Sequence, residues 1–581
     1  MTRLHAVLNP GCAVVHDEAM SQPTSGSSGT PRVAIFGGGV GGLSVAQELL
    51  ARGFSVTVYE KCHWGGKVRG MPVPDSGTQG RDDLPGQHGF HFFPGFYKNL
   101  PDTMKRIPSL DGKSVFEHVV AGDAELLARQ EDPSTKIPAA FHFSLKWLLE
   151  ALHAFRVLMY KIPPQEMAFF IGRALAFLGT CRERRITEFD EVSWWDFVEA
   201  ERMSPEYQAL IGRLPALALV AVRPEEASTR TLGDAMIQMF SYGFFPGRTI
   251  DRLLDGPEQA YWVEPWVTQL QKLGGDLRMP AQLVAFQCDG RKITSALVEE
   301  AGTVHKVVAD YYVCALPLHV AVHKLTADIR RAAPSLARIG ELASGWMNGV
   351  QLFLNRQLPL VCGHVGYADS AWALTSVSQA QFWPDFDWSA YGNGRSREAF
   401  SVIISDWDTP GVVHHKPAKQ CSPQEIYEEV LAQLNLSLAK HGEGIQLRDV
   451  ESWFIDPDIV FPRGDEGQDE NRESLFITTC GAWSSRPTAK TEIPNLFMAS
   501  EWMRHCMDFA SAEGTNQVAR EAANAILDAA GSTAKRCQVY RTEQPLFSLP
   551  LRALDAVLYR CGLPSLGCWG FTSYTPPPRV R

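Results

Sequence analysis

The stretch RVAIFGGGVGGLSVAQELLARGFSVTVYEKCHWGGKVRG, residues 32–70, decides the fold of this chain. Residues 33–36 are an apolar run of strand type, and residues 43–52 have the periodicity of a helix with one apolar face. Gly53 ends this helix, and residues 55–59 form a second strand. The pattern predicts one β-α-β unit of the kind that binds a dinucleotide.

Three glycines follow the first strand in the spacing G-x-G-x-x-G. Gly37 suits the tight turn, Gly39 lets the backbone approach a pyrophosphate, and Gly42 lets the helix pack on the strand. The pyrophosphate would lie at the helix N-terminus, where free N–H groups and the helix dipole favour negative charge. Glu60, at the end of the second strand, stands where an acid that binds ribose hydroxyls is expected. A glycine-rich turn in another α/β unit is the alternative.

Composition limits the classes of function. The chain has 581 residues, more than one hydrophobic core normally supports, so we expect several domains. A formal net charge of −10 argues against charge-driven binding of nucleic acid. The 12 cysteines are scattered without a C-x-x-C pair or a Cys/His cluster, so no metal site is expected. No secretory signal is recognisable, and we expect a cytoplasmic protein with free thiols.

The rest of the chain alternates between α/β and helical character. Residues 87–99, QHGFHFFPGFYKN, are dense in aromatics and glycine and predict a wall packed close to a ligand. Helical periodicity runs through residues 144–240, and the apolar run 167–179 is too short to span a membrane. We expect a buried helix there, or one that lies on a membrane surface. Strand-like segments at 276–315 include a hairpin signal at Asp289-Gly290.

Four stretches together resemble the flavin-containing amine oxidoreductase superfamily, and within it the phytoene desaturase-like and squalene or carotenoid desaturases. The first is the N-terminal unit, in which GGKVRG follows the acid, and the second is residues 87–99. Residues 256–317 are similar to the family's run of helix, Gly-Gly, strands and Ala-Leu-Pro turn. Residues 495–526 resemble its closing flavin motif, although Ser500-Glu501 replaces the usual Gly-Asp and Ala512 replaces the usual Met.

The resemblance implies FAD, bound non-covalently. The residues it assigns to the cofactor are Gly37, Gly39, Gly42, Glu60, Gly66, Lys67, Val284, Glu501 and Ala512. Among them, Gly66 and Lys67 would pass along the flavin side, and the backbone of Val284 would pair with adenine. Glu501 would face the ribityl-phosphate region. The helix after Ala512 would direct its N-terminus at the O2 edge of the flavin and stabilise negative charge on the reduced ring.

The fold expected is α/β, with a discontinuous Rossmann-like FAD-binding domain and a mixed α+β substrate domain that includes a helical insertion. The three FAD-binding parts are residues 31–115, 255–330 and 471–531. The helical substrate-binding insertion is 116–254, and the substrate-domain sheet is 331–470. Residues 1–30 have a linker composition and are expected to be disordered, and 532–581 hold a C-terminal helix and a tail.

The resemblance implies an FAD-dependent oxidoreductase of the desaturase or dehydrogenase type, which moves a hydride from a C–H bond of an apolar, isoprenoid-like substrate to flavin N5. An amine or amino-acid oxidase and a flavin-dependent isomerase are the alternatives. His91 is the candidate catalytic group, although a histidine in an aromatic segment is often a hydrogen-bonded core residue. Trp483 and Trp502 could form an amine oxidase's aromatic cage, or be core residues. The expected electron acceptor is oxygen or a quinone, and peripheral membrane contact stays open.

Overall fold

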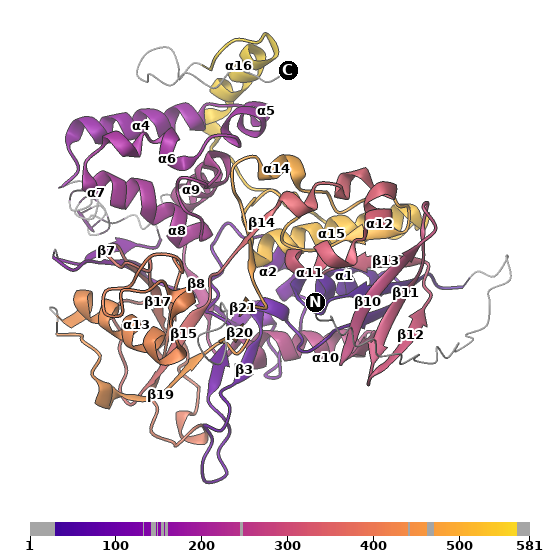
Figure 1. The fold of residues 1–581 in the computed structure, drawn as a ribbon, viewed down its shortest axis with the longest axis horizontal. Coiled ribbons are helices and arrows are strands. Elements are labelled where there is room, and N and C mark those ends of the chain that lie inside the picture. The colour runs from indigo at the N-terminus through magenta and orange to yellow at the C-terminus, as the bar shows by residue number, and fades with distance from the viewer. Residues whose placement is uncertain are drawn as a thin grey trace, which may run out of the picture.

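The computed structural model describes residues 29–565 except 132, 141–143, 145, 146, 148, 151, 153–155, 157–160, 244–247, 440, 441 and 462–469. The predicted disordered segment thus lies outside the described residues up to residue 28, as does the tail from residue 566. Figure 1 shows three groups of elements: a cofactor lobe with α1 and α15, a sheet covered by α13, and a group of helices that includes α4 and α9.

The cofactor lobe is built on a five-stranded sheet that contains the predicted β-α-β unit. Its strands are parallel, and they lie in the order β23 (Leu496–Met498), β13 (Tyr311–Cys314), β1 (Arg32–Phe36), β2 (Ser55–Tyr59) and β9 (Asp276–Arg278). These strands come from three separate stretches of the chain. The expected fold, a discontinuous Rossmann-like domain, is confirmed.

Two helices pack against each other beside this sheet. All residues of α1 (Val40–Leu50) are buried, and α15 (Ala512–Ala529) packs against it, with Asn516 Nδ2 donating to Ser44 Oγ at 2.8 Å. The helix α1 begins three residues before the predicted start, because Gly39 already serves as its N-cap. The phosphate loop therefore leads directly into the first helical turn.

The predicted hairpin at Asp289-Gly290 is confirmed. It joins β10 (Ala281–Cys288) to β11 (Ile293–Glu300), and β12 (Thr303–Val307) completes an antiparallel three-stranded sheet. The register of β10 shifts between Leu283 and Ala285, so that Val284 lies at an irregularity of the strand. Upstream, α10 (Glu264–Lys272) matches the helix of the family pattern.

The second lobe contains a seven-stranded mixed sheet, and α13 (Pro423–Leu438) packs on it. The strands lie in the order β19 (Val450–Ile455), β15 (Gly349–Leu354), β18 (Glu398–Ile403), β17 (Thr375–Ser378), β16 (His364–Tyr367), β6 (Ala124–Ala128) and β7 (Thr135–Pro138). Both β6 and β7 fall within residues 116–254, where helices were expected, as do β5 (Val119–Ala121) and β8 (Arg252–Leu254). The helical prediction is wrong at these ends of the insertion, because β6 is stabilised by pairing with the distant β16, which local periodicity cannot reveal.

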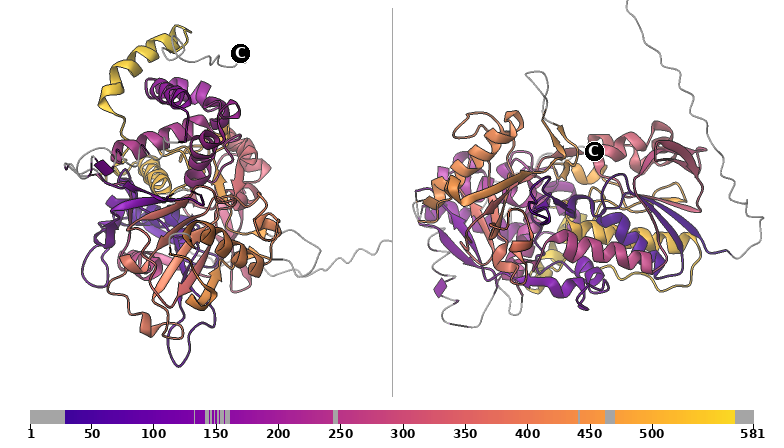
Figure 2. Two further views of the ribbon diagram at one scale, coloured as in Figure 1. Left: turned by 90° about the vertical axis from the view of Figure 1, so that its left-hand side faces the viewer. Right: turned by 90° about the horizontal axis from the view of Figure 1, so that it is seen from below.

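The centre of the insertion is helical, as expected. It includes α4 (Pro164–Leu178), α8 (Leu214–Val220) and α9 (Thr229–Gly243), and α16 (Leu549–Arg560) lies against it (Figure 2). Arg184 Nε donates to Asp555 Oδ1 at 3.0 Å, and both side chains are buried, which ties α16 to the insertion. Among the described helices, none has both the length and the hydropathy needed to cross a bilayer.

Candidate functional site

The glycine loop leaves no room for side chains on the protein side. A Cβ atom on Gly42 would lie 1.9 Å from the Gly37 carbonyl oxygen, and one on Gly41 would lie 1.9 Å from the Ala499 carbonyl oxygen. Gly37 has a φ of +107°, which L side chains rarely adopt. For a Cβ atom placed on Gly39, by contrast, the nearest neighbouring atom would be Gly66 Cα at 3.7 Å, an ordinary van der Waals distance. The Gly39 backbone is therefore accessible to a ligand. The sequence did not single out Gly41, because the residue it packs against, Ala499, belongs to the closing motif.

A cavity of about 1190 Å³ begins at this loop and reaches the helical insertion. Most of the predicted site residues line it together: Gly37, Gly39, Glu60, Gly66, Lys67, His91, Glu501 and Ala512. Two do not. Gly42 lies behind the loop, in keeping with a packing role, and Val284 lies outside the lining, with its carbonyl accepting from Lys324 Nζ at 3.1 Å. The adenine contact of Val284 stays a prediction, and Leu283 is its nearest neighbour on the cavity wall.

Glu60 is held at the cavity wall by backbone donors. Its carboxylate accepts from the Gly38 N–H at 2.6 Å and from the Cys62 N–H at 2.8 Å. Gly38 lies in the loop after β1, and Cys62 lies in the loop after β2. Their N–H groups therefore hold the acid beside the phosphate loop. This place suits a carboxylate that binds ribose hydroxyls.

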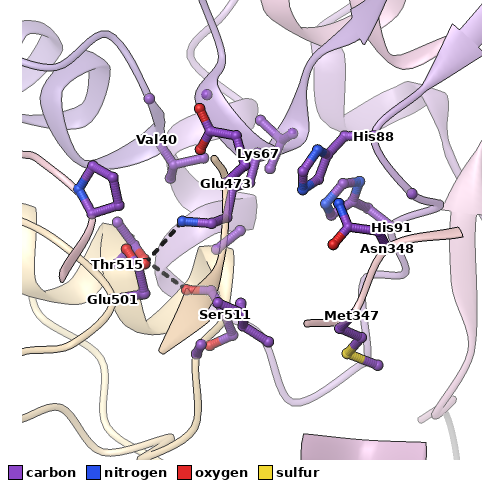
Figure 3. A pocket seen from close by; sticks show the side chains of 18 of the residues that line it. Val40, Lys67, His88, His91, Met347, Asn348, Glu473, Glu501, Ser511 and Thr515 are labelled. Carbon is purple, nitrogen blue, oxygen red and sulfur yellow. Dashed lines mark hydrogen bonds and ion pairs between the residues drawn. The ribbon is translucent and has the colours of Figure 1, made fainter. Parts of the chain in front are cut away.

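Lys67 and Glu501 form an ion pair across the cofactor end of the cavity (Figure 3). Lys67 Nζ lies 3.1 Å from Glu501 Oε1, and Ser500 Oγ donates to Glu501 Oε2 at 2.6 Å. Burial alone would raise the pKa of Glu501, but the Lys67 ammonium and the Ser500 hydroxyl hold it below its ordinary value. Glu501 is therefore a fixed negative charge at the position where the family pattern has Asp.

The N-terminus of α15 also faces the cavity, through Ser511, Ala512 and Thr515. Ser511 is the N-cap, and its Oγ accepts from the Gly514 N–H at 3.1 Å. The free N–H groups and the dipole of this 18-residue helix favour negative charge in the cavity. This is the arrangement expected for the closing motif, with the backbone at Ala512 available whatever its side chain.

Two histidines from residues 87–99 lie opposite the Lys67–Glu501 pair (Figure 3). His91 Nδ1 lies 3.0 Å from Glu258 Oε1, which also accepts from the His91 backbone N–H. Burial alone would lower the pKa of His91, but the Glu258 carboxylate raises it overall. His88 Nδ1 contacts the carboxylate of the buried Asp456. The sequence singled out His91 but neither of the two carboxylates, which come from distant segments.

The described lining of the cavity includes neither Trp483 nor Trp502, so the two residues do not form an aromatic cage there. The Trp502 indole is fully buried and donates to the Leu316 carbonyl at 3.0 Å. The Trp483 ring lies under the Arg230 guanidinium at 4.0 Å. Both act as packing residues.

The far end of the cavity is apolar and is formed by the insertion and the β6–β7 hairpin. Its lining includes Leu126, Leu127, Ile137, Leu214, Leu219, Met236, Met239 and Phe240. The polar end therefore offers a phosphate loop, a ribose acid and a helix N-terminus, and the other end offers apolar walls. The residues present fit FAD: Gly37 and Gly39 would hold the pyrophosphate, Glu60 would bind the ribose, and the flavin would lie towards the N-terminus of α15.

Comparison with known proteins agrees with this geometry. A family model for flavin containing amine oxidoreductase matches residues 40–527. The chain is 24% identical over 541 residues to zeta-carotene desaturase of Arabidopsis thaliana, covering 86% of this chain and 85% of that protein. It is 23% identical over 338 residues to 15-cis-phytoene desaturase of Synechococcus elongatus, covering 56% and 66%.

A solved structure of putrescine oxidase bound to putrescine has a similar fold. The TM-score is 0.57 at 14% identity, covering 86% of this chain and 99% of that one. With the glycine loop, the ribose acid and the closing helix around one cavity, the chain belongs to the flavin containing amine oxidoreductase family and is an FAD-dependent oxidoreductase.

Proposed function

We propose that this enzyme is a desaturase or dehydrogenase that acts on a C–H bond of a lipophilic, isoprenoid-like substrate. FAD, when bound, supplies the hydride acceptor, N5 of its isoalloxazine ring. The observation that carries the proposal is the single cavity that joins the cofactor-binding loop to the apolar walls of the insertion. An apolar substrate would bury its surface against these walls, which exclude water from the reacting bond.

The distribution of lysines favours this reaction over amine oxidation. The described cavity lining contains Lys61, Lys67 and Lys324. Lys67 is paired with Glu501, Lys324 donates to the Val284 carbonyl, and Lys61 directly follows the ribose acid. Two of the three lysines are thus engaged by protein groups, and the third lies beside the ribose acid, so the described lining offers no unengaged lysine away from Glu60 for the flavin-site role of an amine oxidase.

His91 is the proposed acid–base group. It lines the cavity, and the Glu258 carboxylate fixes Nδ1, so that Nε2 is the atom able to give or take a proton. The carbon next to the one that gives up the hydride loses a proton, and this proton would pass to His91 Nε2. The relatives named as zeta-carotene and phytoene desaturases support the choice of a polyene or polyene precursor as the substrate.

The proposal includes peripheral contact with a membrane, from which such a substrate would enter. Exposed apolar side chains lie on α4 (Ile171 and Leu175) and on α16 (Leu551, Leu554 and Val557). The two helices meet where Gly179 approaches Leu551, at the outer end of the insertion (Figure 2). Phe240 of α9 both lines the cavity and is 55% exposed, so an apolar side chain of the lining also reaches the surface of the same group of helices.

The test is anaerobic reduction of the flavin. The holoenzyme, identified by its visible flavin spectrum, is mixed with phytoene or zeta-carotene in detergent micelles, and we expect the flavin absorbance to bleach and the product to gain a double bond. Reoxidation by oxygen or by a quinone then identifies the acceptor. Anaerobic bleaching by amines, followed by release of peroxide when oxygen is admitted, would establish an amine oxidase instead, and a product of unchanged oxidation state would establish an isomerase.

A further inference from the structure

A second imidazole–carboxylate pair lies in the wall of the same cavity. His364, the first residue of β16, has its Nδ1 2.8 Å from Asp251 Oδ1, and its backbone N–H donates to Asp251 Oδ2 at 3.0 Å. The rings of Phe90 and Phe92 lie 5.0 Å and 5.1 Å from the imidazole, between centroids. The imidazole is therefore fixed in position. Its Nε2 has no hydrogen-bond partner among the described residues.

Glu125 lies beside this histidine. Strand β6 pairs in parallel with β16, with Leu126 opposite Val365, so that Glu125 and His364 are neighbours at the start of the two strands. Both residues line the cavity. Within the part of the chain that the structure describes, no hydrogen bond joins the Glu125 carboxyl group to another residue. The next residues of the hairpin that line the cavity are the apolar Leu126, Leu127 and Ile137.

The pKa shifts of both groups favour their protonated forms, in which they are donors. Burial and the Asp251 carboxylate raise the pKa of Glu125 to about 7, against the opposing effect of His364. Burial alone would lower the pKa of His364, but Asp251 and Glu125 raise it overall. A neutral carboxyl group and an Nε2–H group both donate hydrogen bonds. Polar groups that face an apolar cavity without a partner are costly, so they indicate a ligand atom that completes them.

We propose that Glu125 and His364 bind the oxygen atom of a hydroxyl or carbonyl group on an otherwise apolar substrate. The inference rests on the proposed function and narrows it, because a pure hydrocarbon would leave both donors unpaired. The pair is separate from the acid–base group. Phe90 and Phe92 contact His364, whereas His91 between them contacts Glu258, so one segment holds two imidazoles with different partners. Binding the oxygen at Glu125 would set which carbon reaches the flavin.

The test compares two probes of the same chain length, 2-undecanone and undecane. Each is titrated into the holoenzyme in the same detergent, and its dissociation constant is read from the perturbation of the flavin spectrum. Partition into micelles cancels when the ketone-to-alkane preference is compared between variants. We expect Glu125→Met to lower the preference for the ketone by about tenfold, the effect of one lost hydrogen bond in a dry site. Glu125→Gln, which keeps a neutral donor, should stay within about twofold of the wild type.

Glu398→Gln is the matched control. Glu398 lies on β18 of the same sheet, is fully buried and bonded to Ser378 and the Ala380 N–H, and does not line the cavity. Its variant should keep the wild-type preference. If Glu125→Met does not take up FAD, Glu125→Leu carries the same expectation. Equal binding of both probes by the wild type, or an unchanged preference in Glu125→Met, would overturn the inference and leave the apolar cavity standing. Failure of both probes to bind would overturn the inference and the proposed function together.

Discussion

Glu513 accepts two hydrogen bonds from Asn99, one from its backbone N–H and one from its side-chain amide, each 2.8 Å long. The same carboxylate accepts from the Leu100 N–H at 2.8 Å, so it caps α2 (Asn99–Met104) from a different part of the chain. Glu513 is the second residue of α15. One side chain thus joins α15, whose N-terminus faces the cavity, to the segment that carries His88 and His91, so the two walls of the cavity are linked.

Replacing this carboxylate should loosen both walls. Glu513→Gln loses at least one backbone acceptor and the charge at the N-terminus of α2, and we expect a loss of about 1–3 kcal/mol in the free energy of unfolding. Urea unfolding of the holoenzyme measures it. Asp528→Asn, at the exposed end of the same helix, should change it by less than about 0.5 kcal/mol. Equal effects of the two substitutions would contradict the capping role.

The packing of Gly41 against Ala499 predicts a severe effect of one methyl group. Gly41→Ala would place its Cβ 1.9 Å from a backbone oxygen, so α1 must move away from the closing motif. We expect loss of FAD from the purified protein, measured by its visible spectrum. Gly172→Ala is the control, since no atom lies within 4 Å of its Cβ position in α4, and it should stabilise the protein by about 0.5–1 kcal/mol.

The Lys67–Glu501 pair predicts a dependence of stability on pH. Because the pKa of Glu501 is lowered in the folded protein, the stability it contributes is fully present above its ordinary value of 4.5. This contribution is lost as the pH falls through the lowered pKa. The difference in unfolding free energy between the wild type and Glu501→Gln should therefore be largest near neutral pH and shrink below about pH 4.5. A difference that grows on acidification would show that the carboxyl group is not stabilised as an anion.

The Glu258–His91 contact predicts a shift in the pH profile of flavin reduction. His91→Asn should slow reduction by about a hundredfold while FAD binding is kept, as expected for a lost acid–base group. In Glu258→Gln the carboxylate that raises the pKa of His91 is gone, so the corresponding limb of the profile should move to lower pH. A structural role alone would leave the position of this limb unchanged. Stopped-flow measurement across the pH range distinguishes the two.

The apolar surface of α4 and α16 predicts binding to lipid. Leu551→Lys combined with Val557→Lys should reduce co-sedimentation with neutral phosphatidylcholine vesicles by about tenfold or more, because two exposed apolar side chains that would enter the lipid surface are replaced by charges. The spectrum of bound FAD should not change. Leu110→Lys, at an 88% exposed position outside these helices, is the control. If the double variant binds vesicles as well as Leu110→Lys does, the apolar surface of α4 and α16 does not bind lipid.

Much of the cofactor half was predictable because its signals are local. The strand, the G-x-G-x-x-G turn, the helix and the acid at residue 60 follow one another within a single β-α-β unit, and each has a residue type that the geometry demands. The strand-like segments after residue 276 and the helix from residue 513 were predicted for the same reason. Errors at the helix starts amount to a few residues, since capping depends on backbone geometry that periodicity does not contain.

The substrate half was less predictable because its residues meet over long separations. No local pattern marks β6 as a strand, and its partner β16 is far along the chain. The carboxylates that orient the cavity histidines, Glu258, Asp456 and Asp251, were equally hidden. Each stands in an unremarkable sequence context and gains its role only from the side chain it touches.

By itself, the sequence determined a flavin-binding fold, because the phosphate loop, the ribose acid and the closing helix N-terminus require particular residues at fixed local spacings. Only the tertiary structure decided how the cavity is walled and charged. Packing brought Lys67 to Glu501, His91 to Glu258 and Glu125 to His364, and burial together with these neighbours shifts the pKa values of Glu501, His91 and Glu125. The charges and hydrogen bonds in the cavity wall depend on contacts between segments far apart in the sequence, and such contacts do not appear as a fixed residue spacing.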